Sequence, residues 1–358
     1  MSVRAFVVLF AIAALAWGVE RAGAGGFAGL GDSGSGFADV VPGKTLSFPD
    51  DFGAHPDYRI EWWYVTANLE DADGNAYGVQ WTLFRQALSP GPEREGWASQ
   101  QVWMGHAAVT SATAHHFAET LARGGIGQAG AKARPFHAWI DDWSFVSTDS
   151  ADASSLRATL LTAKGADFSY SLALKTDHAP ALQGDNGYSR KSERGQASYY
   201  YSQPFFDVRG TLTLSGRSIA VTGQAWMDRE WSSQPLAADQ KGWDWFSLHL
   251  PGGDKLMLFQ LRGADGDFYR AGSWIGADGR AVALDAADIA LTPLTQHDVS
   301  GRRLPISWKV DVKSRGLSIE TTPLNAESWM ATIFPYWEGP VRFSGSHAGV
   351  GYLEMTGY

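Results

Sequence analysis

The sequence predicts an all-β protein in which two tandem antiparallel β-barrel domains pack together. Beyond about residue 44, short segments rich in aromatic and β-branched residues alternate with turn signals, as is typical of consecutive strands. The 358 residues include 41 glycines and 15 prolines, a content that favours many short strands over long helices. The two halves also repeat similar motifs in the same order. A closed barrel in each half is the economical way for so many strands to avoid exposed edges.

The amino terminus has the pattern of a signal peptide over residues 1–24. Arg4 supplies a positive charge, residues 5–17 are apolar, and Ala22-Gly23-Ala24 offers a small-x-small cleavage site. The apolar run is short for a bilayer span, and no later stretch reaches the required ~20 apolar residues. We therefore expect an exported protein, periplasmic or secreted, with no membrane span after cleavage. An uncleaved membrane anchor is the alternative.

Residues 25–44 are expected to form a flexible leader, because their first part is rich in glycine and serine. We expect the first barrel over residues 45–208 and the second over residues 209–358. Helical periodicity is hard to find, and its best candidate is residues 112–123. The expected strands cover residues 60–68, 76–86, 102–110, 168–175, 210–214, 219–226, 243–250, 255–262, 307–312 and 317–321.

The internal duplication is degenerate but can be followed along the chain. Glu61-Trp62-Trp63-Tyr64, a hairpin and Leu83-Phe84-Arg85 are echoed by Trp243-Asp244-Trp245-Phe246, a turn and Gln260-Leu261-Arg262. Each half then closes with an aromatic cluster followed by two strands. The spacing drifts between the halves, so the repeat marks related domains and not a short repeated unit.

Composition and missing motifs exclude several classes of function. The chain has no cysteine, which excludes disulfides, thiolate metal sites and a cysteine nucleophile. Its net charge of −9, without a Lys/Arg tract, argues against nucleic acid and anionic membranes as partners. The G-x-G-x-x-G match at residues 125–130 opens no helix, and the adjacent His115 and His116 would point to opposite strand faces. We therefore predict no metal and no cofactor.

Four aromatic motifs stand out along the chain: Glu61-Trp62-Trp63-Tyr64, Trp226-Met227-Asp228-Arg229-Glu230-Trp231, Gly242-Trp243-Asp244-Trp245-Phe246, and Tyr336-Trp337-Glu338-Gly339 with Gly351-Tyr352-Leu353-Glu354-Met355-Thr356-Gly357-Tyr358. These motifs resemble the AttH-like family, which includes the carotenoid hydratases (hydroxyneurosporene synthases), and the resemblance covers nearly all of the chain after residue 44. It implies two lipocalin-like barrels packed together, in agreement with the duplication. Members of the family differ in chemistry: some hydrate a terminal double bond of carotenoids, relatives catalyse pericyclic cyclisations, and many exported bacterial members are labelled predicted hydrolases.

Hydration of an isoprenoid end group needs an acid that protonates an alkene, and water that captures the resulting cation. A carboxyl in an apolar pocket can serve as the acid, and aromatic faces stabilise the cation. By strand alternation, Trp226, Asp228 and Glu230 share one face, while Met227 and Arg229 take the other. The resemblance matches Asp228 to the proposed catalytic acid of the carotenoid hydratases.

The match departs from the hydratases at neighbouring positions. They are His/Asn-rich after the aspartate, whereas this chain has Arg229 and Glu230, and their earlier His-x-Trp pair is replaced by Tyr199 and Tyr201. An adjacent arginine is expected to favour an ionised carboxylate and to weaken Asp228 as an acid. The structural alternative is that Asp228, Arg229 and Glu230 form a salt-bridge cluster between the barrels.

Other candidate residues have both structural and functional interpretations. His106 is expected to be a core histidine rather than a pocket donor, and Glu61 to pair with an arginine. Arg85 is either a buried arginine that closes over an indole or a solvated strand end. The candidate ligand-binding residues are Tyr199, Tyr201, Trp226, Trp63, Arg85, His106 and Trp245. The tryptophans are included because Trp suits the walls of apolar pockets.

Two functions from different classes follow from the sequence. The favoured one is an exported lipocalin-like carrier that binds a lipid or isoprenoid and serves a transporter. The alternative is a cofactor-free hydratase of isoprenoid double bonds, with Asp228 as general acid assisted by Glu230 and Arg229. A secreted hydrolase is a second alternative that rests on family labels alone.

Overall fold

The computed structural model describes residues 27–32 and 34–358, and these residues form an all-β protein, as predicted. The expected signal peptide and its cleavage site lie outside the described residues. In the part of the chain that is described, no helix is long and apolar enough to cross a membrane. The helices of this part are single 3-10 turns: η1 (Phe27–Gly29), η2 (Asp50–Phe52), η3 (Gly96–Ala98), η4 (Pro251–Gly253), η5 (Ala286–Asp288) and η6 (Lys313–Arg315).

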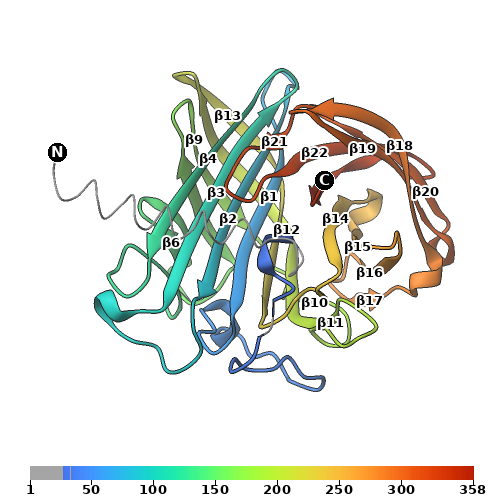
Figure 1. Ribbon diagram of the computed structural model, residues 1–358. Coiled ribbons are helices and arrows are strands. Elements are labelled where there is room, and N and C mark those ends of the chain that lie inside the picture. The colour runs from blue at the N-terminus through green and yellow to red at the C-terminus, as the bar shows by residue number, and fades with distance from the viewer. Residues whose placement is uncertain (1–26, 33) are drawn as a thin grey trace.

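The first sheet has 13 antiparallel strands and curls into a nearly closed barrel (Figure 1). Along it the strand order is β4-β3-β2-β1-β13-β12-β9-β8-β7-β6-β5, with β10 and β11 paired to β12. Its strands are β1 (Ile60–Glu70), β2 (Ala76–Ala87), β3 (Gln101–Ser111), β4 (His115–Arg123), β5 (Ala129–Ala133), β6 (Phe136–Ile140), β7 (Trp143–Ser147), β8 (Ala158–Lys164), β9 (Phe168–Lys175), β10 (Ala181–Leu182), β11 (Tyr188–Arg190), β12 (Ala197–Leu214) and β13 (Arg217–Ser232).

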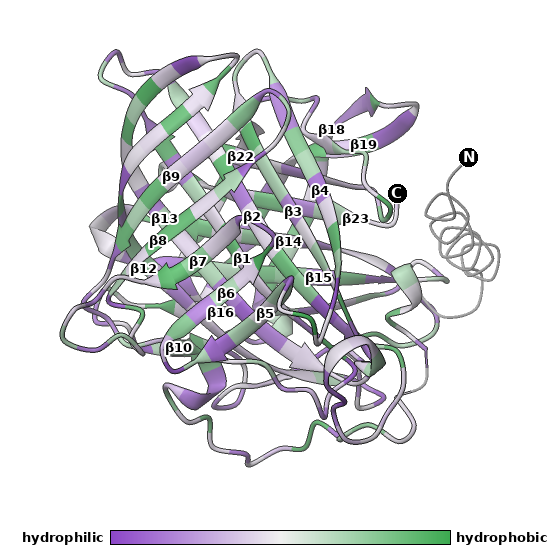
Figure 2. Ribbon diagram, turned by 90° about the vertical axis from the view of Figure 1, so that its left-hand side faces the viewer, coloured by the Kyte–Doolittle hydropathy of each residue, from purple (hydrophilic) through white to green (hydrophobic). Residues whose placement is uncertain are grey.

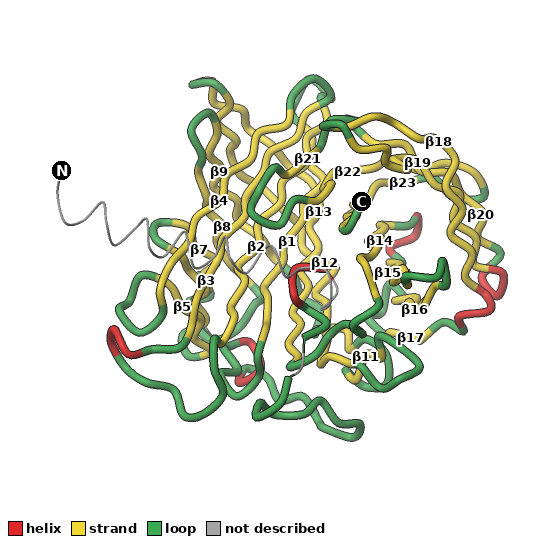
Figure 3. Tube along the Cα trace, viewed as in Figure 1, coloured by secondary structure: helices red, strands yellow, loops and turns green. Residues whose placement is uncertain are grey.

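The second sheet has 10 antiparallel strands and forms a half-barrel beside the first (Figure 3). Its order is β17-β16-β15-β14-β23-β22-β20-β19-β18, with β21 paired to β22. Its strands are β14 (Gln240–His249), β15 (Lys255–Gly263), β16 (Phe268–Ile275), β17 (Ala281–Ala283), β18 (Ile289–Val299), β19 (Arg302–Val312), β20 (Leu317–Pro323), β21 (Trp329–Met330), β22 (Tyr336–Gly345) and β23 (Gly349–Thr356).

Two sequence expectations differ from this architecture. The boundary expected at 208/209 falls inside β12, and the chain passes between the sheets at residues 233–239. The reason is that β13 pairs with β1 from Ile60↔Ser232 to Glu70↔Thr222, so the β12–β13 hairpin belongs to the barrel. The helix candidate at 112–123 is mostly strand β4, because its backbone pairs with β3 along nearly its whole length.

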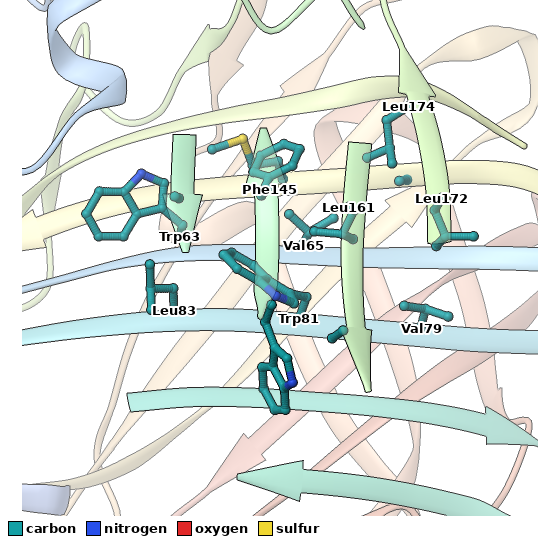
Figure 4. Close-up of a cluster of buried hydrophobic side chains, with 14 of the residues drawn as sticks. Trp63, Val65, Val79, Trp81, Leu83, Phe145, Leu161, Leu172 and Leu174 are labelled. Carbon is teal, nitrogen blue, oxygen red and sulfur yellow. The ribbon is translucent and has the colours of Figure 1, made fainter. Parts of the chain in front are cut away.

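Apolar side chains fill the interior of the barrel. Alternate residues of β1, including Trp63 and Val65, point inward and pack with Trp81, Phe145 and Leu161 from the other strands (Figure 4). Colouring by hydropathy shows the same alternation along the barrel strands (Figure 2). The half-barrel has a core of its own. The expected ligand-binding residue Trp63 is therefore part of the barrel core.

The outer faces of the two sheets meet in a third cluster of buried side chains, which we call the interdomain layer. The sheets approach closely at Gly78, where an added Cβ would lie 2.5 Å from both Pro340 Cγ and Tyr352 Oη. Asn68 Nδ2 crosses the same boundary and donates to the carbonyl oxygen of Gly351 at 2.9 Å. The buried hydrophobic residues of the interdomain layer are Leu30, Ile60, Tyr64, Ala181, Tyr200, Trp226, Leu236, Trp245, Met257, Phe259, Leu261, Ile275 and Tyr352.

Deletion of residues 351–358 should unfold the half-barrel. These residues form most of β23, which pairs with β14 on one side and β22 on the other, and whose Leu353 and Met355 lie in the half-barrel core. The truncation opens two strand edges and removes core contacts together. Circular dichroism during heating should show loss of the cooperative transition of this domain, and a truncated chain that keeps a full cooperative melt would refute the expectation.

Candidate functional site

Asp228 lies in the interdomain layer and is almost completely buried, with 3% of its surface exposed. Its Oδ1 accepts hydrogen bonds from the Trp226 indole at 2.7 Å and from the Ser202 hydroxyl at 2.5 Å. Its Oδ2 lies 2.7 Å from the Tyr200 hydroxyl, which also accepts a bond from the Trp245 indole at 3.2 Å. Three barrel residues therefore bond to the carboxyl directly, and Trp245 of the half-barrel is linked to it through Tyr200.

This environment keeps a proton available on Asp228. Burial raises the pKa of the Asp228 carboxyl from 3.8 to about 7, against the opposing effect of the hydrogen bonds from Ser202, Tyr200 and Trp226. The nearby charge of Glu230 raises it further. A carboxyl group with a pKa near 7 is well matched to proton transfer at neutral pH.

The predicted strand alternation around Asp228 is confirmed, and it separates Arg229 from this carboxyl. Arg229 points into the barrel, where its guanidinium pairs with Glu61 and lies 3.8 Å from the centre of the Trp63 ring. The expectation that Arg229 would keep Asp228 ionised is wrong, because successive residues of a strand face opposite sides of the sheet. The proposed cluster of Asp228, Arg229 and Glu230 does not form as one network.

Arg229 instead belongs to a buried ionic cluster inside the barrel. Glu61 pairs with both Arg85 and Arg229, which confirms its predicted pairing with an arginine, and His55 Nδ1 lies 3.2 Å from the same carboxylate. Burial would raise the pKa of Glu61, but the charges of Arg85 and Arg229 hold it well below its usual range. Arg85 is buried, so it is not a solvated strand end, and it donates to the Gln101 side-chain oxygen at 2.6 Å. The guanidinium group that lies over the indole rings of Trp63 and Trp231 belongs to Arg229.

Glu230 does face the interdomain layer, beside Asp228. It pairs with Lys191 at 2.8 Å and accepts a bond from the Ser198 hydroxyl at 2.5 Å. Tyr199 and Tyr201 point the other way, into the barrel core, where Tyr201 donates to the backbone oxygen of Asp51 at 3.2 Å. Tyr200 and Ser202, which contact Asp228, are alternate residues of β12 on the opposite face from Tyr199 and Tyr201. The β12–β13 register indicates this placement, because Ser202 pairs with Asp228 and Tyr200 with Glu230.

A second pair of carboxyl groups faces the interdomain layer from the half-barrel. Glu338 accepts a bond from Tyr64 at 2.8 Å, and Glu354 accepts one from the Trp243 indole. Burial raises the pKa of Glu354 to about 7, and burial with the charge of Glu354 raises the pKa of Glu338 well above its usual range. Both glutamates lie in the last of the four aromatic motifs, and the sequence pattern alone predicts no role for them.

His106 links the two domains as a satisfied buried histidine. Its Nδ1 lies 2.9 Å from the Tyr336 hydroxyl, and its Nε2 lies 3.0 Å from Glu119. Burial lowers the pKa of His106, which keeps the ring neutral. No group of three or more His, Asp or Glu side chains in the described residues could hold a metal ion.

One surface cavity lies beside Lys191, because it is lined by Ser192 and by Gln240, whose side chain donates to the Lys191 carbonyl oxygen. It has a volume of about 200 Å³, and its walls include Ser192, Gln240 and Leu261. Lys191 precedes Ser192, and its ammonium group lies 4.4 Å from the Phe259 ring centre and bonds to Glu230. Another cavity, of about 210 Å³, is lined by residues of both sheets that include Asn68 and Pro340.

The raised pKa of Asp228 predicts a pH-dependent loss of stability. Because the folded-state pKa exceeds the unfolded value of 3.8, the contribution of Asp228 to the stability of the fold is largest below pH 3.8, and this contribution is lost as pH rises through about 7. Relative to Asp228→Asn, the wild-type chain should lose about 4 kcal/mol of unfolding free energy between about pH 4 and pH 8. Urea unfolding of both proteins at a series of pH values measures the difference, and a constant difference contradicts the assignment.

Comparisons with known proteins agree with the fold and with the motifs. A solved structure from Nitrosomonas europaea, described as an AttH, is 35% identical, covers 90% of this chain and 100% of its own, and has a TM-score of 0.78. Kievitone hydratase from Nectria haematococca is 15% identical over 90% of this chain and 96% of its own, with a TM-score of 0.67. CghA, solved with Sch210972, is 12% identical over 91% of this chain and 97% of its own, with a TM-score of 0.55.

The similarity to kievitone hydratase and to CghA shows the fold alone. A comparison with curated proteins found no match. The family model described as AttH-like matches residues 39–358, which is nearly the whole described chain. Together with the similarity to the Nitrosomonas europaea structure, this match shows that the chain belongs to the AttH-like family.

Proposed function

We propose that the chain is a cofactor-free hydro-lyase, in which Asp228 protonates a carbon–carbon double bond of an apolar, isoprenoid-like substrate. The observation that carries the proposal is the carboxyl of Asp228, buried among aromatic side chains from two domains with its pKa raised to about 7. Protonation of an alkene needs a carboxyl that still holds its proton at neutral pH, and burial supplies that condition. The fold shared with kievitone hydratase is compatible with this class of reaction.

The surroundings of Asp228 suit the cation that protonation creates. Trp226 donates to the carboxyl, while Tyr64 and Trp245 pack edge to face, with ring centres 5.2 Å apart, in the same layer. Aromatic faces stabilise a nearby positive charge through their quadrupoles. The transfer moves one proton from Asp228 to carbon; water then bonds to the cationic carbon and gives up a proton, so the net reaction is addition of one water.

We place the entry of the substrate at the cavity beside Lys191. Leu261 lines this cavity and also belongs to the interdomain layer. Movement of the Lys191 side chain, which now pairs with Glu230, would connect the cavity to the side of the layer that carries Asp228. The barrel interior is a less suitable site, because its core is filled by Trp63, Trp81 and their neighbours.

Incubation with acyclic isoprenoids in heavy-oxygen water tests the proposal. The expected product is a tertiary alcohol that carries the heavy oxygen, detected by mass spectrometry. Asp298→Asn is a matched control, because Asp298 is exposed on β18 in the half-barrel, and it should leave the incorporation unchanged. Absence of label from every acyclic polyene tested with the folded wild-type protein would overturn the proposal.

A carrier of lipids or isoprenoids, acting with a transporter, is our second proposal. In the cavity beside Lys191, Leu261, Phe268 and Tyr269 offer an apolar guest a contact surface, and charged residues such as Arg194 and Arg270 on the same walls could hold a polar head group. Mass spectrometry of organic extracts from the purified protein should then detect a bound lipid. Protein that is isolated empty and that binds no fluorescent lipid probe would contradict this function.

A further inference from the structure

Glu338 and Glu354 lie directly opposite each other in neighbouring strands. The register of β22 and β23 pairs Glu338 with Glu354, and both carboxyls reach the interdomain layer. Glu338 is fully buried, and its Oε1 accepts the bond from Tyr64. No ordinary donor among the described residues bonds to its other oxygen, Oε2, and the Glu354 carboxyl lies within hydrogen-bond reach of Glu338. A buried carboxyl oxygen without a partner is costly, so this atom calls for a physical explanation.

A shared proton explains the unpartnered oxygen. Facing residues of paired strands have Cβ atoms about 5 Å apart, so the two carboxyls are close neighbours. Two carboxylates at this distance in an apolar setting cannot both be ionised without a large cost. One proton between them removes one charge and gives Oε2 of Glu338 a hydrogen bond. The raised pKa values of both groups agree with this arrangement.

The glutamate pair and Asp228 belong to the same aromatic layer. Tyr64, whose hydroxyl bonds to Glu338, is the cross-strand partner of Asp228 in the β1–β13 register. Trp245 is the cross-strand partner of Glu354 and donates to Tyr200, which in turn bonds to Asp228. Two proton-holding groups, one from each domain, therefore flank the ring contact between Tyr64 and Trp245.

We propose that Glu338 and Glu354 hold one proton between them and accept a second from the water molecule that captures the substrate cation. The proposal rests on the hydro-lyase function given above. Asp228 loses its proton to carbon, the water oxygen bonds to the adjacent cationic carbon, and the proton released from that water goes to the glutamate pair. One proton then returns from the pair to Asp228 through solvent, so no other reactant is consumed.

Other titratable groups also face the pair. Tyr64, Tyr336 and Tyr352 surround Glu338, and burial keeps the pKa of each well above its usual range, so they stay neutral. Across the layer, the charges of Asp228 and Glu230 act on Glu354 and favour its protonated form. These neighbours favour a protonated Glu354 even if the two glutamates do not share a proton. The experiment must therefore distinguish the effect of the neighbouring charges from proton sharing.

NMR titration of carbon-13-labelled glutamate carboxyls separates the two effects. In Glu338→Gln, the amide can donate to Glu354 and the shared proton is gone, so Glu354 should titrate at clearly lower pH than in the wild type. Likewise, Glu338 should titrate at lower pH in Glu354→Gln than in the wild type. Glu320→Gln, at an exposed position of β20, is the matched control and should change neither. Unchanged titration of Glu354 in folded Glu338→Gln would overturn the shared proton.

The kinetic part uses the heavy-oxygen assay. Glu354→Gln should lower kcat about 100-fold with little change in KM, and should change the pH profile of kcat, as expected for loss of a proton acceptor. Full kcat with an unaltered pH profile would overturn the catalytic role of the pair. Absence of hydration by the wild type would reject the hydro-lyase function and this role with it, while the NMR titration would still decide whether the proton is shared.

Discussion

Replacement of Asp228 by asparagine should reduce heavy-oxygen incorporation by about 100-fold to 10,000-fold, the usual range for loss of a general acid. The asparagine oxygen can still accept from Trp226 and Ser202, and its amide can donate to the Tyr200 hydroxyl. The variant should therefore fold normally and, at pH 8, be at least as stable as the wild type. The measurements are product analysis and urea unfolding at the same pH.

The Asp228→Asn variant separates catalysis from structure because it keeps the shape of the neutral carboxyl. Incorporation that continues at the wild-type rate would show that Asp228 is not the acid. A variant that fails to fold would instead favour a structural role for the carboxyl. Ser202→Ala offers a second comparison: it removes one donor to Oδ1 and should raise the pKa of Asp228 without removing its proton.

Replacement of Glu61 by glutamine should destabilise the barrel by about 3–5 kcal/mol, as is usual when one partner of a buried ion pair is removed. Glu61 is fully buried and faces both Arg85 and Arg229, so the variant leaves two guanidinium charges without their carboxylate. Urea unfolding monitored by tryptophan fluorescence measures the loss. The exposed Glu320→Gln is the control and should change the unfolding free energy by less than about 0.5 kcal/mol.

An unfolding free energy of Glu61→Gln within the range of that control would contradict the proposed role of the ionic cluster. If this variant folds, Asp228 should titrate as in the wild type, because the sheet separates the barrel interior from the interdomain layer. The two variants thus distinguish the two charged clusters that the motif at residues 226–231 contributes to.

Local alternation made part of the site predictable from sequence. A strand over residues 226–231 must place Asp228 and Arg229 on opposite faces, and the structure has them there. The expected effect of Arg229 on Asp228 failed because it relied on adjacency in the sequence, although the sheet lies between the two side chains. The same period of two makes Tyr200, and not Tyr199 or Tyr201, the neighbour of Asp228.

Contacts between the domains could not be predicted in this way. His106 bonds to Tyr336, which is 230 residues further along the chain, and Tyr64 bonds to Glu338 across 274 residues. Such pairs depend on how the outer faces of the two sheets pack, which no local pattern encodes. The domain boundary was misplaced for a related reason, since only the pairing of β13 with β1 assigns the hairpin of β12 and β13 to the barrel.

The most direct test of the account is the titration of the Asp228 carboxyl itself. NMR of protein labelled with carbon-13 at the aspartate carboxyls, with the Asp228 signal identified by its absence from Asp228→Asn, follows its protonation with pH. Burial in the interdomain layer predicts a midpoint near pH 7. A midpoint near the ordinary value of 3.8 would show that Asp228 is ionised at neutral pH, and would contradict its role as the proton donor.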